Sequence, residues 1–165
     1  MGMRKRPHFF MKKVMFISSG GGHLEELLQL KPLFDHYDYS LISEKTDTTL
    51  FLKRKYRNVS YLIYGTKDHL LPYLFIFPLN IILSFFLFLR YRPDYVVTTG
   101  THTAVPMCFI AHLFSRKVIF IETLANISTP TKAGSMVYKI ADLFIVQWEE
   151  MLKVYPKAEY WGNIF

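Results

Sequence analysis

Cysteine and acidic residues are both scarce in this sequence. The single Cys108, in an apolar stretch, can form neither a disulfide framework nor a cysteine-based zinc site, and a reducing cytosolic compartment fits best. Thirteen Asp and Glu residues face twenty Lys and Arg residues, which gives a formal net charge of +7 in a chain that is 51% hydrophobic. This balance favours an anionic membrane surface or an anionic substrate. The basic residues are scattered and form no run interleaved with aromatics, so nucleic acid is not an expected partner.

Linkers, internal repeats and low-complexity tracts are also missing. The 165 residues suit one domain, which we place at 13–165 after a basic lead-in at 1–12. The lead-in starts like a signal peptide, but Lys12 and Lys13 interrupt the apolar run that should follow, so we expect no signal peptide. A two-domain enzyme that uses a nucleotide sugar needs about twice this length, which raises the prospect of a partner subunit.

The remaining chain alternates between short runs rich in Val, Ile and Phe and segments that favour helices. This rhythm is typical of a parallel sheet covered on both faces, and it predicts a doubly wound, Rossmann-like α/β domain. Expected strands are Lys13–Ser19, Tyr39–Ser43, Val59–Tyr64, Tyr95–Thr99, Val118–Glu122, Leu143–Val146 and a short one near Glu159–Trp161. Expected helices are His23–Phe34, Asp47–Tyr56, Thr103–Phe114, Thr131–Ala141 and an amphipathic Trp148–Tyr155 that is a plausible contact for a partner.

The segment Leu70–Leu89 breaks the rhythm, because it carries no charge over a length that can span a bilayer. A helix that spans the membrane would place the strands before and after it on opposite sides, although both must belong to one parallel sheet. A crossover helix that is buried only against the sheet would not be apolar around its whole circumference, as this segment is. We therefore favour a monotopic helix with one face on the sheet and one in lipid, entered in plane through breaks at Pro72 and Pro78. Its expected membrane contacts are Leu74, Phe77, Ile81, Phe85 and Phe88, with Arg90 and Arg92 at lipid phosphates.

A glycine-rich turn, Ser18–His23, follows the first strand. Its glycines permit close backbone approach, and the helix start behind them favours a phosphate or diphosphate, although a tight turn that binds nothing fits the same residues. Glu44 stands where a dinucleotide-binding fold has its ribose-binding acid. Glu25, however, occupies the place of a required glycine, and no Walker lysine follows. A stand-alone nucleotide-binding oxidoreductase is therefore only a lesser alternative.

Two further strand ends carry polar residues, Thr98–Thr103 and Glu122–Asn126. Ligands of doubly wound sheets bind beyond the carboxyl ends of the strands, so we expect His23, His102 and Glu122 to converge there. A histidine suits proton transfer with a sugar hydroxyl, although each can equally be a structural hydrogen-bonding residue. The spacing has no metal-ligand signature, and we predict no metal.

Four stretches in this order resemble the Alg14 family of oligosaccharide biosynthesis proteins, in particular bacterial capsule and exopolysaccharide subunits of the PssD and EpsE type. They are Lys13–His23, Tyr95–Pro106, Val118–Glu122 and Ala141–Trp148. The resemblance implies the acceptor-binding, N-terminal half of a GT-B glycosyltransferase similar to MurG. It also implies an Alg13-like partner subunit that binds the UDP-sugar, so that this chain alone binds no cofactor. Together they would glycosylate a polyprenyl-diphosphate-linked saccharide at the cytoplasmic face of the plasma membrane.

The same resemblance assigns roles to individual residues. His23 is the expected catalytic base and Glu122 a second catalytic residue. Asn126 stands where bacterial relatives carry an arginine, which removes one cation from the acceptor site. Eukaryotic members add an N-terminal anchor, and here segment 70–89 is expected to provide attachment. A non-catalytic membrane scaffold for the partner is an alternative. The expected acceptor and phosphate contacts are Ser19, Gly20, Gly21, Gly22, Thr99, Gly100, Thr101, His102 and Asn126.

Overall fold

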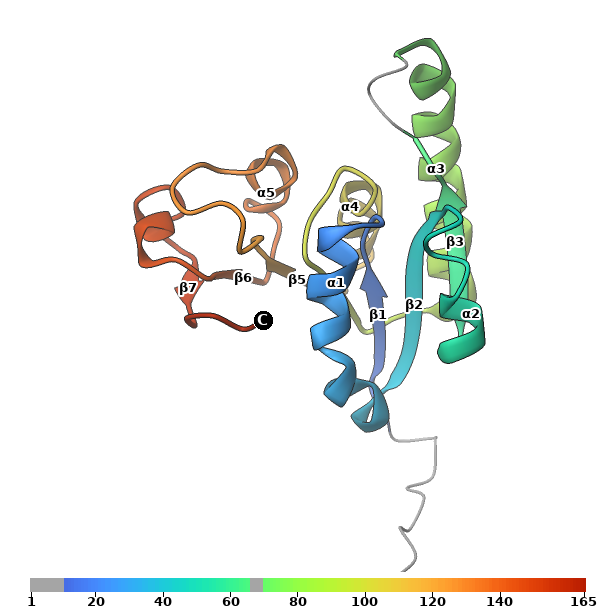
Figure 1. Cartoon of the computed structure of the whole chain (residues 1–165), viewed down its shortest axis with the longest axis horizontal. Coiled ribbons are helices and arrows are strands. Elements are labelled where there is room, and N and C mark those ends of the chain that lie inside the picture. Colours follow the sequence, from blue (N-terminus) through green and yellow to red (C-terminus); the bar gives the residue numbers. More distant parts are fainter. Residues whose placement is uncertain (1–10, 66–69) are drawn as a thin grey trace, which may run out of the picture.

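A single parallel sheet of seven strands organises the part of the chain that the computed structural model describes, residues 11–65 and 70–165. Every pair of neighbouring strands is parallel, and the spatial order is β3-β2-β1-β4-β5-β6-β7. The predicted doubly wound, Rossmann-like sheet is therefore confirmed (Figure 1). The strands are β1 (Lys13–Ile17), β2 (Asp38–Lys45), β3 (Val59–Ile63), β4 (Tyr95–Thr98), β5 (Lys117–Ile121), β6 (Leu143–Val146) and β7 (Glu159–Tyr160). Most of the basic lead-in lies outside the described residues.

Two hydrophobic cores lie on opposite faces of this sheet. Along β1, Val14 and Phe16 point to one core and Met15 and Ile17 to the other, as the two-residue period of a strand requires. The first core is covered by α1 (Gly22–Gln29), the 3-10 helix η2 (Lys31–His36) and α2 (Leu52–Lys55). The second is covered by α3 (Leu70–Tyr91), α4 (Val105–Leu113), α5 (Lys132–Val137) and the 3-10 helix η3 (Glu149–Lys153).

Several predicted helices are shorter than expected or change type. The helix expected over His23–Phe34 ends at Gln29 and continues as a 3-10 helix, because Pro32 has no N–H to donate to the preceding turn. The amphipathic α-helix expected over Trp148–Tyr155 is wrong, since only a five-residue 3-10 helix forms there. The predicted break at Pro78 is also wrong, because α3 runs through this residue without interruption.

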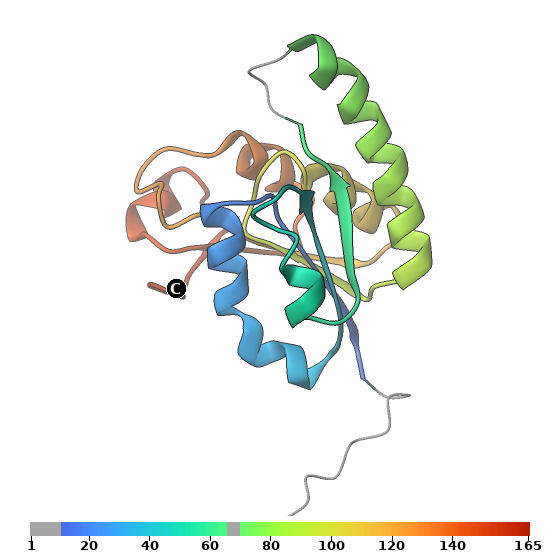
Figure 2. The same ribbon diagram turned by 45° about the vertical axis from the view of Figure 1, so that its right-hand side comes forward.

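Helix α3 is much longer than the strand on which it packs. Its 22 residues rise roughly 33 Å, whereas the five residues of β3 extend roughly 16 Å. Its C-terminal half lies along the sheet, and its N-terminal half projects past the carboxyl ends of the strands (Figures 1 and 2). An apolar helix therefore stands beside the edge at which ligands of this fold bind.

Candidate functional site

An open depression lies at the carboxyl edge of the sheet, where the strand order reverses between β1 and β4. Its volume is about 970 Å³, and loops after β1, β2, β3 and β4 all contribute to it. Of the predicted acceptor contacts, the depression brings together Ser19, Gly20, Gly21, Thr101 and His102. Its other lining residues, which we did not assign to an acceptor, are Glu44, Lys45, Thr46, Asp47, Thr48, Tyr64 and Gly65.

The glycine turn forms the β1 side of the depression. Gly21 has a φ of 70°, a left-handed conformation that a residue with a side chain rarely adopts. Its carbonyl oxygen accepts the N–H groups of Leu24 and Glu25 at 3.0 and 3.1 Å, which starts α1 at once. The exposed Gly22 is the first residue of that helix and does not line the depression.

His23 connects this turn to the loop after β4. Its Nδ1 donates to the carbonyl oxygen of Thr99 at 2.9 Å, because a carbonyl can only accept. The Thr99 hydroxyl donates in return to the His23 carbonyl oxygen at 2.7 Å. The bond at Nδ1 leaves the lone pair of the neutral ring on Nε2, and the side chain is 31% exposed. Gly100, with a φ of 107°, lets the loop pass close to the ring.

Glu26, which we did not predict, faces His23 one turn along α1. Its Oε2 lies 3.9 Å from His23 Nδ1. Its Oε1 accepts the Thr123 hydroxyl at 2.8 Å and the Leu124 N–H at 3.1 Å, both in the loop after β5. The carboxylate therefore joins the first turn of α1 to a third strand end. The spacing His-x-x-Glu places both side chains on one helix face, and this was the available signal in the sequence.

The loop after β4 places Thr101 and His102 in the depression. Thr101 has a φ of 80°, which is unusual for a β-branched residue, and its buried hydroxyl has no hydrogen-bond partner among the described residues. His102 Nε2 donates to the Gly65 carbonyl oxygen at 3.2 Å and lies 4.0 Å from Glu44 Oε1. Glu44 accepts a short hydrogen bond from the Thr103 hydroxyl, and burial raises the pKa of its carboxyl group.

The predicted convergence of His23, His102 and Glu122 is wrong. Glu122 is 1% exposed and lies beneath α5, where its Oε2 accepts the hydroxyls of Thr131 and Tyr155, each at 3.1 Å. Burial raises the pKa of this carboxyl group. Ile121 points to the core under α1, so the next residue must point to the opposite face of the sheet.

The remaining predicted contacts also lie away from the depression. Asn126 belongs to the loop after β5, and its Nδ2 donates to the Thr129 carbonyl oxygen at 2.9 Å. The Thr99 side chain is fully buried, and its hydroxyl is used by His23. Within the described ranges, no group of three His, Cys, Asp or Glu side chains is placed to hold a metal ion.

The outer surface of α3 is apolar, whereas polar side chains point inward. Asn80 Nδ2 donates to the Ile63 carbonyl oxygen at 2.8 Å and its Oδ1 accepts the Ile63 N–H at 2.9 Å, which caps the edge strand β3. Ser84, one turn later, is fully buried. From residue 74 onward, where the side chains are described, the exposed large side chains of this helix are Leu74, Phe75, Leu79, Ile81, Ile82, Phe85, Phe86 and Leu89.

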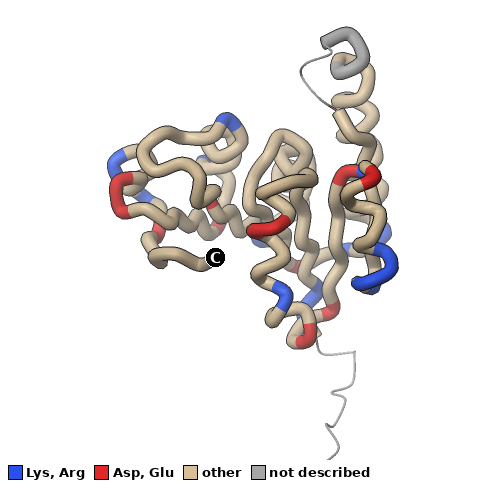
Figure 3. The backbone as a smooth tube through the Cα atoms, in the orientation of Figure 1, with Lys and Arg blue, Asp and Glu red and all other residues tan. Residues whose placement is uncertain are grey.

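Most of the predicted membrane contacts lie on this outer surface, but Phe88 does not. Phe88 is buried against the core, so its assignment to the membrane face was wrong, and Phe77 is only half-buried. The window Leu74–Tyr91 is long and apolar enough to cross a membrane by length and composition, and only 17% of it is buried. The sequence of α3 has no charged residue before Arg90, and Arg90 and the nearby Arg92 are both exposed. Figure 3 accordingly shows the described part of the projecting half of this helix in tan.

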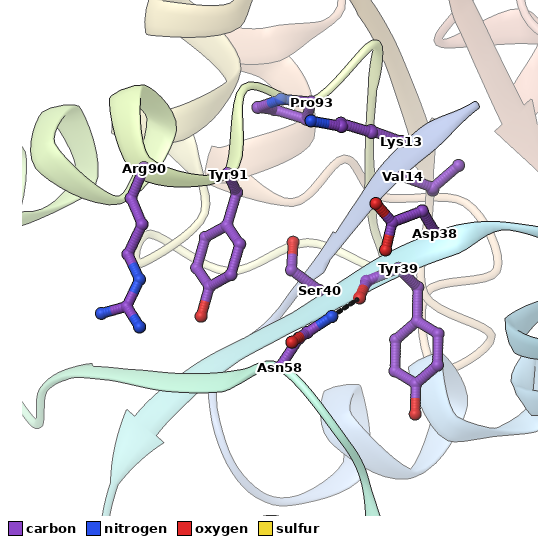
Figure 4. Close-up of a pocket in the computed structure, with 9 residues that line it drawn as sticks. All are labelled: Lys13, Val14, Asp38, Tyr39, Ser40, Asn58, Arg90, Tyr91 and Pro93. Atoms are coloured by element: carbon purple, nitrogen blue, oxygen red, sulfur yellow. Dashed lines mark hydrogen bonds between the residues drawn. The ribbon is translucent and has the colours of Figure 1, made fainter. Parts of the chain in front are cut away.

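A smaller pocket, of about 210 Å³, lies at the opposite, amino edge of the sheet. Arg90 and Tyr91 at the end of α3 face Ser40 and Asn58 across it (Figure 4). Asn58 Nδ2 donates to the Tyr39 carbonyl oxygen at 3.1 Å. The Tyr91 hydroxyl is hydrogen-bonded to Ser60 at 2.7 Å, so this end of α3 is fixed to the sheet.

Comparison with known proteins adds a family and a shared fold. Residues 66–164, more than half of the chain, match the model of the family described as oligosaccharide biosynthesis protein Alg14 like. The chain is 38% identical over 88 residues to the human UDP-N-acetylglucosamine transferase subunit ALG14, a match that covers 50% of this chain and 41% of the human protein. The Candida albicans subunit of the same name is 35% identical over 80 residues, which are 45% of this chain and 36% of that protein.

Solved structures share the fold at low sequence identity. MurG of Acinetobacter baumannii superposes with a TM-score of 0.70 at 16% identity, over 84% of this chain and 42% of that enzyme. The UDP-N-acetylglucosamine 2-epimerase of Rickettsia bellii gives 0.70 at 16% identity, over 93% of this chain and 45% of the epimerase. The chain thus spans less than half the length of each of these proteins and has the fold of one Rossmann-like half of a GT-B enzyme.

Proposed function

Since the chain belongs to the family of Alg14-like oligosaccharide biosynthesis proteins, we propose that it is the membrane-attached, acceptor-binding half of a two-subunit glycosyltransferase. The observation that carries this proposal is the position of the depression beside the projecting, outwardly apolar half of α3. A lipid-linked acceptor needs both features together. Its saccharide has to reach a polar site while its polyprenyl chain stays in the bilayer.

The lining of the depression suits the polar end of such an acceptor. The Ser19–Gly21 turn allows close backbone approach, and the buried Thr101 hydroxyl, which has no hydrogen-bond partner among the described residues, suits a polar ligand. Glu44 and Asp47 on the β2 side disfavour phosphate there and suit sugar hydroxyls. The acceptor diphosphate therefore lies at the glycine turn, with the reacting hydroxyl of the saccharide beside His23, which follows that turn.

In this proposal His23 is the catalytic base. Its Nε2 takes the proton of the acceptor hydroxyl as that oxygen attacks the anomeric carbon of the UDP-sugar, and the bond from this carbon to UDP breaks with inversion. The donor is held by an Alg13-like subunit at the cleft between the two proteins. His23→Ala should abolish transfer and leave membrane attachment intact.

Attachment in this proposal is monotopic, on the cytoplasmic face of the plasma membrane. The outer side chains of α3 enter the lipid, and Arg90 and Arg92 meet lipid phosphates. A bacterial role in capsule or exopolysaccharide synthesis follows from the resemblance to subunits of the PssD and EpsE type. The sugar to test first is N-acetylglucosamine, because the relatives are named for its transfer.

Sugar transfer with separated components tests this function. Radiolabelled UDP-N-acetylglucosamine and other UDP-sugars are offered to a lipid-diphosphate-linked acceptor with this protein, with an Alg13-like subunit, and with both. Activity only in the mixture supports a split enzyme. Activity of the partner alone, merely raised by this chain, makes the chain a membrane scaffold, and activity of this chain alone contradicts the proposal.

A further inference from the structure

The Glu26 carboxylate has two oxygens in different situations. Oε1 accepts two hydrogen bonds from the loop after β5, at 2.8 and 3.1 Å. Oε2 is buried and has no hydrogen-bond partner among the residues that the structure describes. A buried carboxylate oxygen without a donor is costly, so its retention needs an explanation. The loop contacts alone do not provide one, because they use only the other oxygen.

This oxygen lies 3.9 Å from Nδ1 of His23, which is within ion-pair distance if the ring is protonated. The Glu26 side chain is 15% exposed, so solvent screens the pair only in part. When Nε2 takes a proton, the ring becomes a cation beside the carboxylate, and an opposite charge at this distance favours the charged form. Glu26 Oε2 therefore faces a positive charge only while the His23 ring is protonated.

Among the described residues, the other contacts of His23 are with uncharged groups. The loop after β4 presents the Thr99 carbonyl oxygen and Gly100 to the ring. His102 in the same loop is directed to Gly65 and Glu44. The loop after β5 contacts Glu26 through uncharged groups, the Thr123 hydroxyl and the Leu124 N–H.

We propose that Glu26 is a positioning residue for His23, whose otherwise unsatisfied carboxylate oxygen stabilises the imidazolium formed when His23 takes the acceptor proton. The proton moves from the acceptor hydroxyl to Nε2 and leaves to solvent after the sugar bond has formed, so the carboxylate is never protonated. The inference rests on the proposed role of His23 as base. It also explains how the loop after β5 is connected to the chemistry, although Glu122 itself points away.

The variant Glu26→Gln tests the roles of the two carboxylate oxygens separately. The amide oxygen can accept both loop hydrogen bonds in place of Oε1, while the charge that faces His23 is lost. Glu25→Gln is the matched control, because it makes the same charge change on the exposed neighbouring residue. Thr123→Val removes the hydrogen bond from Thr123 to Glu26, together with the one that the Thr123 hydroxyl accepts from the Ala125 N–H, and keeps the charge of Glu26.

The first readout needs no activity. The ring nitrogen signals of His23 are compared by NMR among the wild type and the three variants, in the full chain bound to lipid nanodiscs. We expect Glu26→Gln to shift the Nδ1 signal, because this atom lies 3.9 Å from the carboxylate oxygen whose charge is lost, and we expect Glu25→Gln and Thr123→Val to leave it in place. An unchanged Nδ1 signal in Glu26→Gln overturns the inference, whatever the activity of the protein.

The second readout is transfer by the complex with the donor-binding subunit. Glu26→Gln should lower kcat about tenfold with KM for the acceptor unchanged, a smaller loss than the roughly hundredfold or greater expected on removal of a general base. The acidic limb of its pH profile should move to lower pH. If Thr123→Val causes the same loss, Glu26 only holds the loop, and the inference is wrong. If the wild-type mixture itself is inactive, the proposed function fails instead.

Discussion

The two faces of the sheet are covered by helices of opposite character. Helix α1 buries Leu24 and Leu27 and exposes Glu25, as an ordinary helix in water does. Helix α3 buries Asn80 and Ser84 and exposes apolar side chains along its length. In the proposed function this difference reflects the medium that each outer surface meets, water at α1 and lipid at α3.

The apolar surface continues from α3 onto α4. Phe109, Leu113 and Phe114 of that region are 43%, 79% and 44% exposed. The rings of Phe85 and Phe114 lie 6.2 Å apart between centroids, so the two helices form one surface. A continuous exposed apolar surface of this kind marks an interaction site. Its end nearest the depression is the N-terminal half of α3, which projects past the carboxyl ends of the strands.

The largest effect is expected from placing charges on this surface. The double variant Phe75→Glu, Phe86→Glu changes two side chains that are 79% and 62% exposed, so folding should be little affected. Each phenylalanine transferred from water to lipid contributes about 1.5–3 kcal/mol, so binding to liposomes should weaken by at least about a hundredfold. Leu33→Glu is the control on the opposite face, where we expect no change. Equal flotation of the double variant with liposomes would remove α3 as the attachment site.

A smaller loss is expected when the inward polar contact is removed. Asn80→Leu deprives the Ile63 backbone of both hydrogen bonds and should lower the free energy of unfolding by about 2–3 kcal/mol. Urea unfolding in detergent measures this change. A variant as stable as the wild type would mean that α3 does not need its inward polar groups. The contrast between α3, with polar groups inside, and α1, with polar groups outside, would then have no structural basis.

The free energy of unfolding should depend on pH through the buried carboxyl group of Glu122, which lies under α5. Burial raises the folded-state pKa of Glu122, so the folded chain holds that proton more tightly than the unfolded chain. This contribution to stability is fully present below about pH 4.5, the unfolded value, and is lost as the pH rises through the folded value. Glu122→Gln should therefore gain stability relative to the wild type as the pH increases. A constant difference in unfolding free energy between pH 4 and 8 would contradict this assignment.

The smallest effect is expected at Ser84, the second inward polar residue of α3. Its buried hydroxyl has no hydrogen-bond partner among the described residues, so Ser84→Ala removes an unsatisfied group and no bond. We expect the free energy of unfolding to rise by less than about 1 kcal/mol. A clear loss would show that Ser84 has a partner in the membrane-bound protein.

The sequence predicted the sheet well, because its strands are continuous apolar runs, but it predicted side-chain directions poorly. Phe88 was assigned to lipid, although Asn80 and Ser84 mark the inward stripe of α3 at a spacing of one turn, and Phe88 lies one further turn along it. Glu122 was expected beside His23, although strand alternation after Ile121 points it to the other face. The link between Glu26 and the loop after β5 joins residues 97 positions apart, and no local pattern predicts such a contact.

Spin labels placed along α3 test the central claim, that this face of the domain lies in the membrane surface beside the acceptor site. Single cysteines at Phe75, Leu79, Ile82, Phe86 and Leu89, in a Cys108→Ser background, report their immersion depth in liposomes by the accessibility of oxygen and of a water-soluble nickel reagent. We predict a similar, shallow depth at all five positions and labels buried in protein at Asn80 and Ser84. A depth that rises to the bilayer centre and falls again would show a spanning helix, and accessibility to the nickel reagent throughout would show that this face meets water; either result contradicts the account.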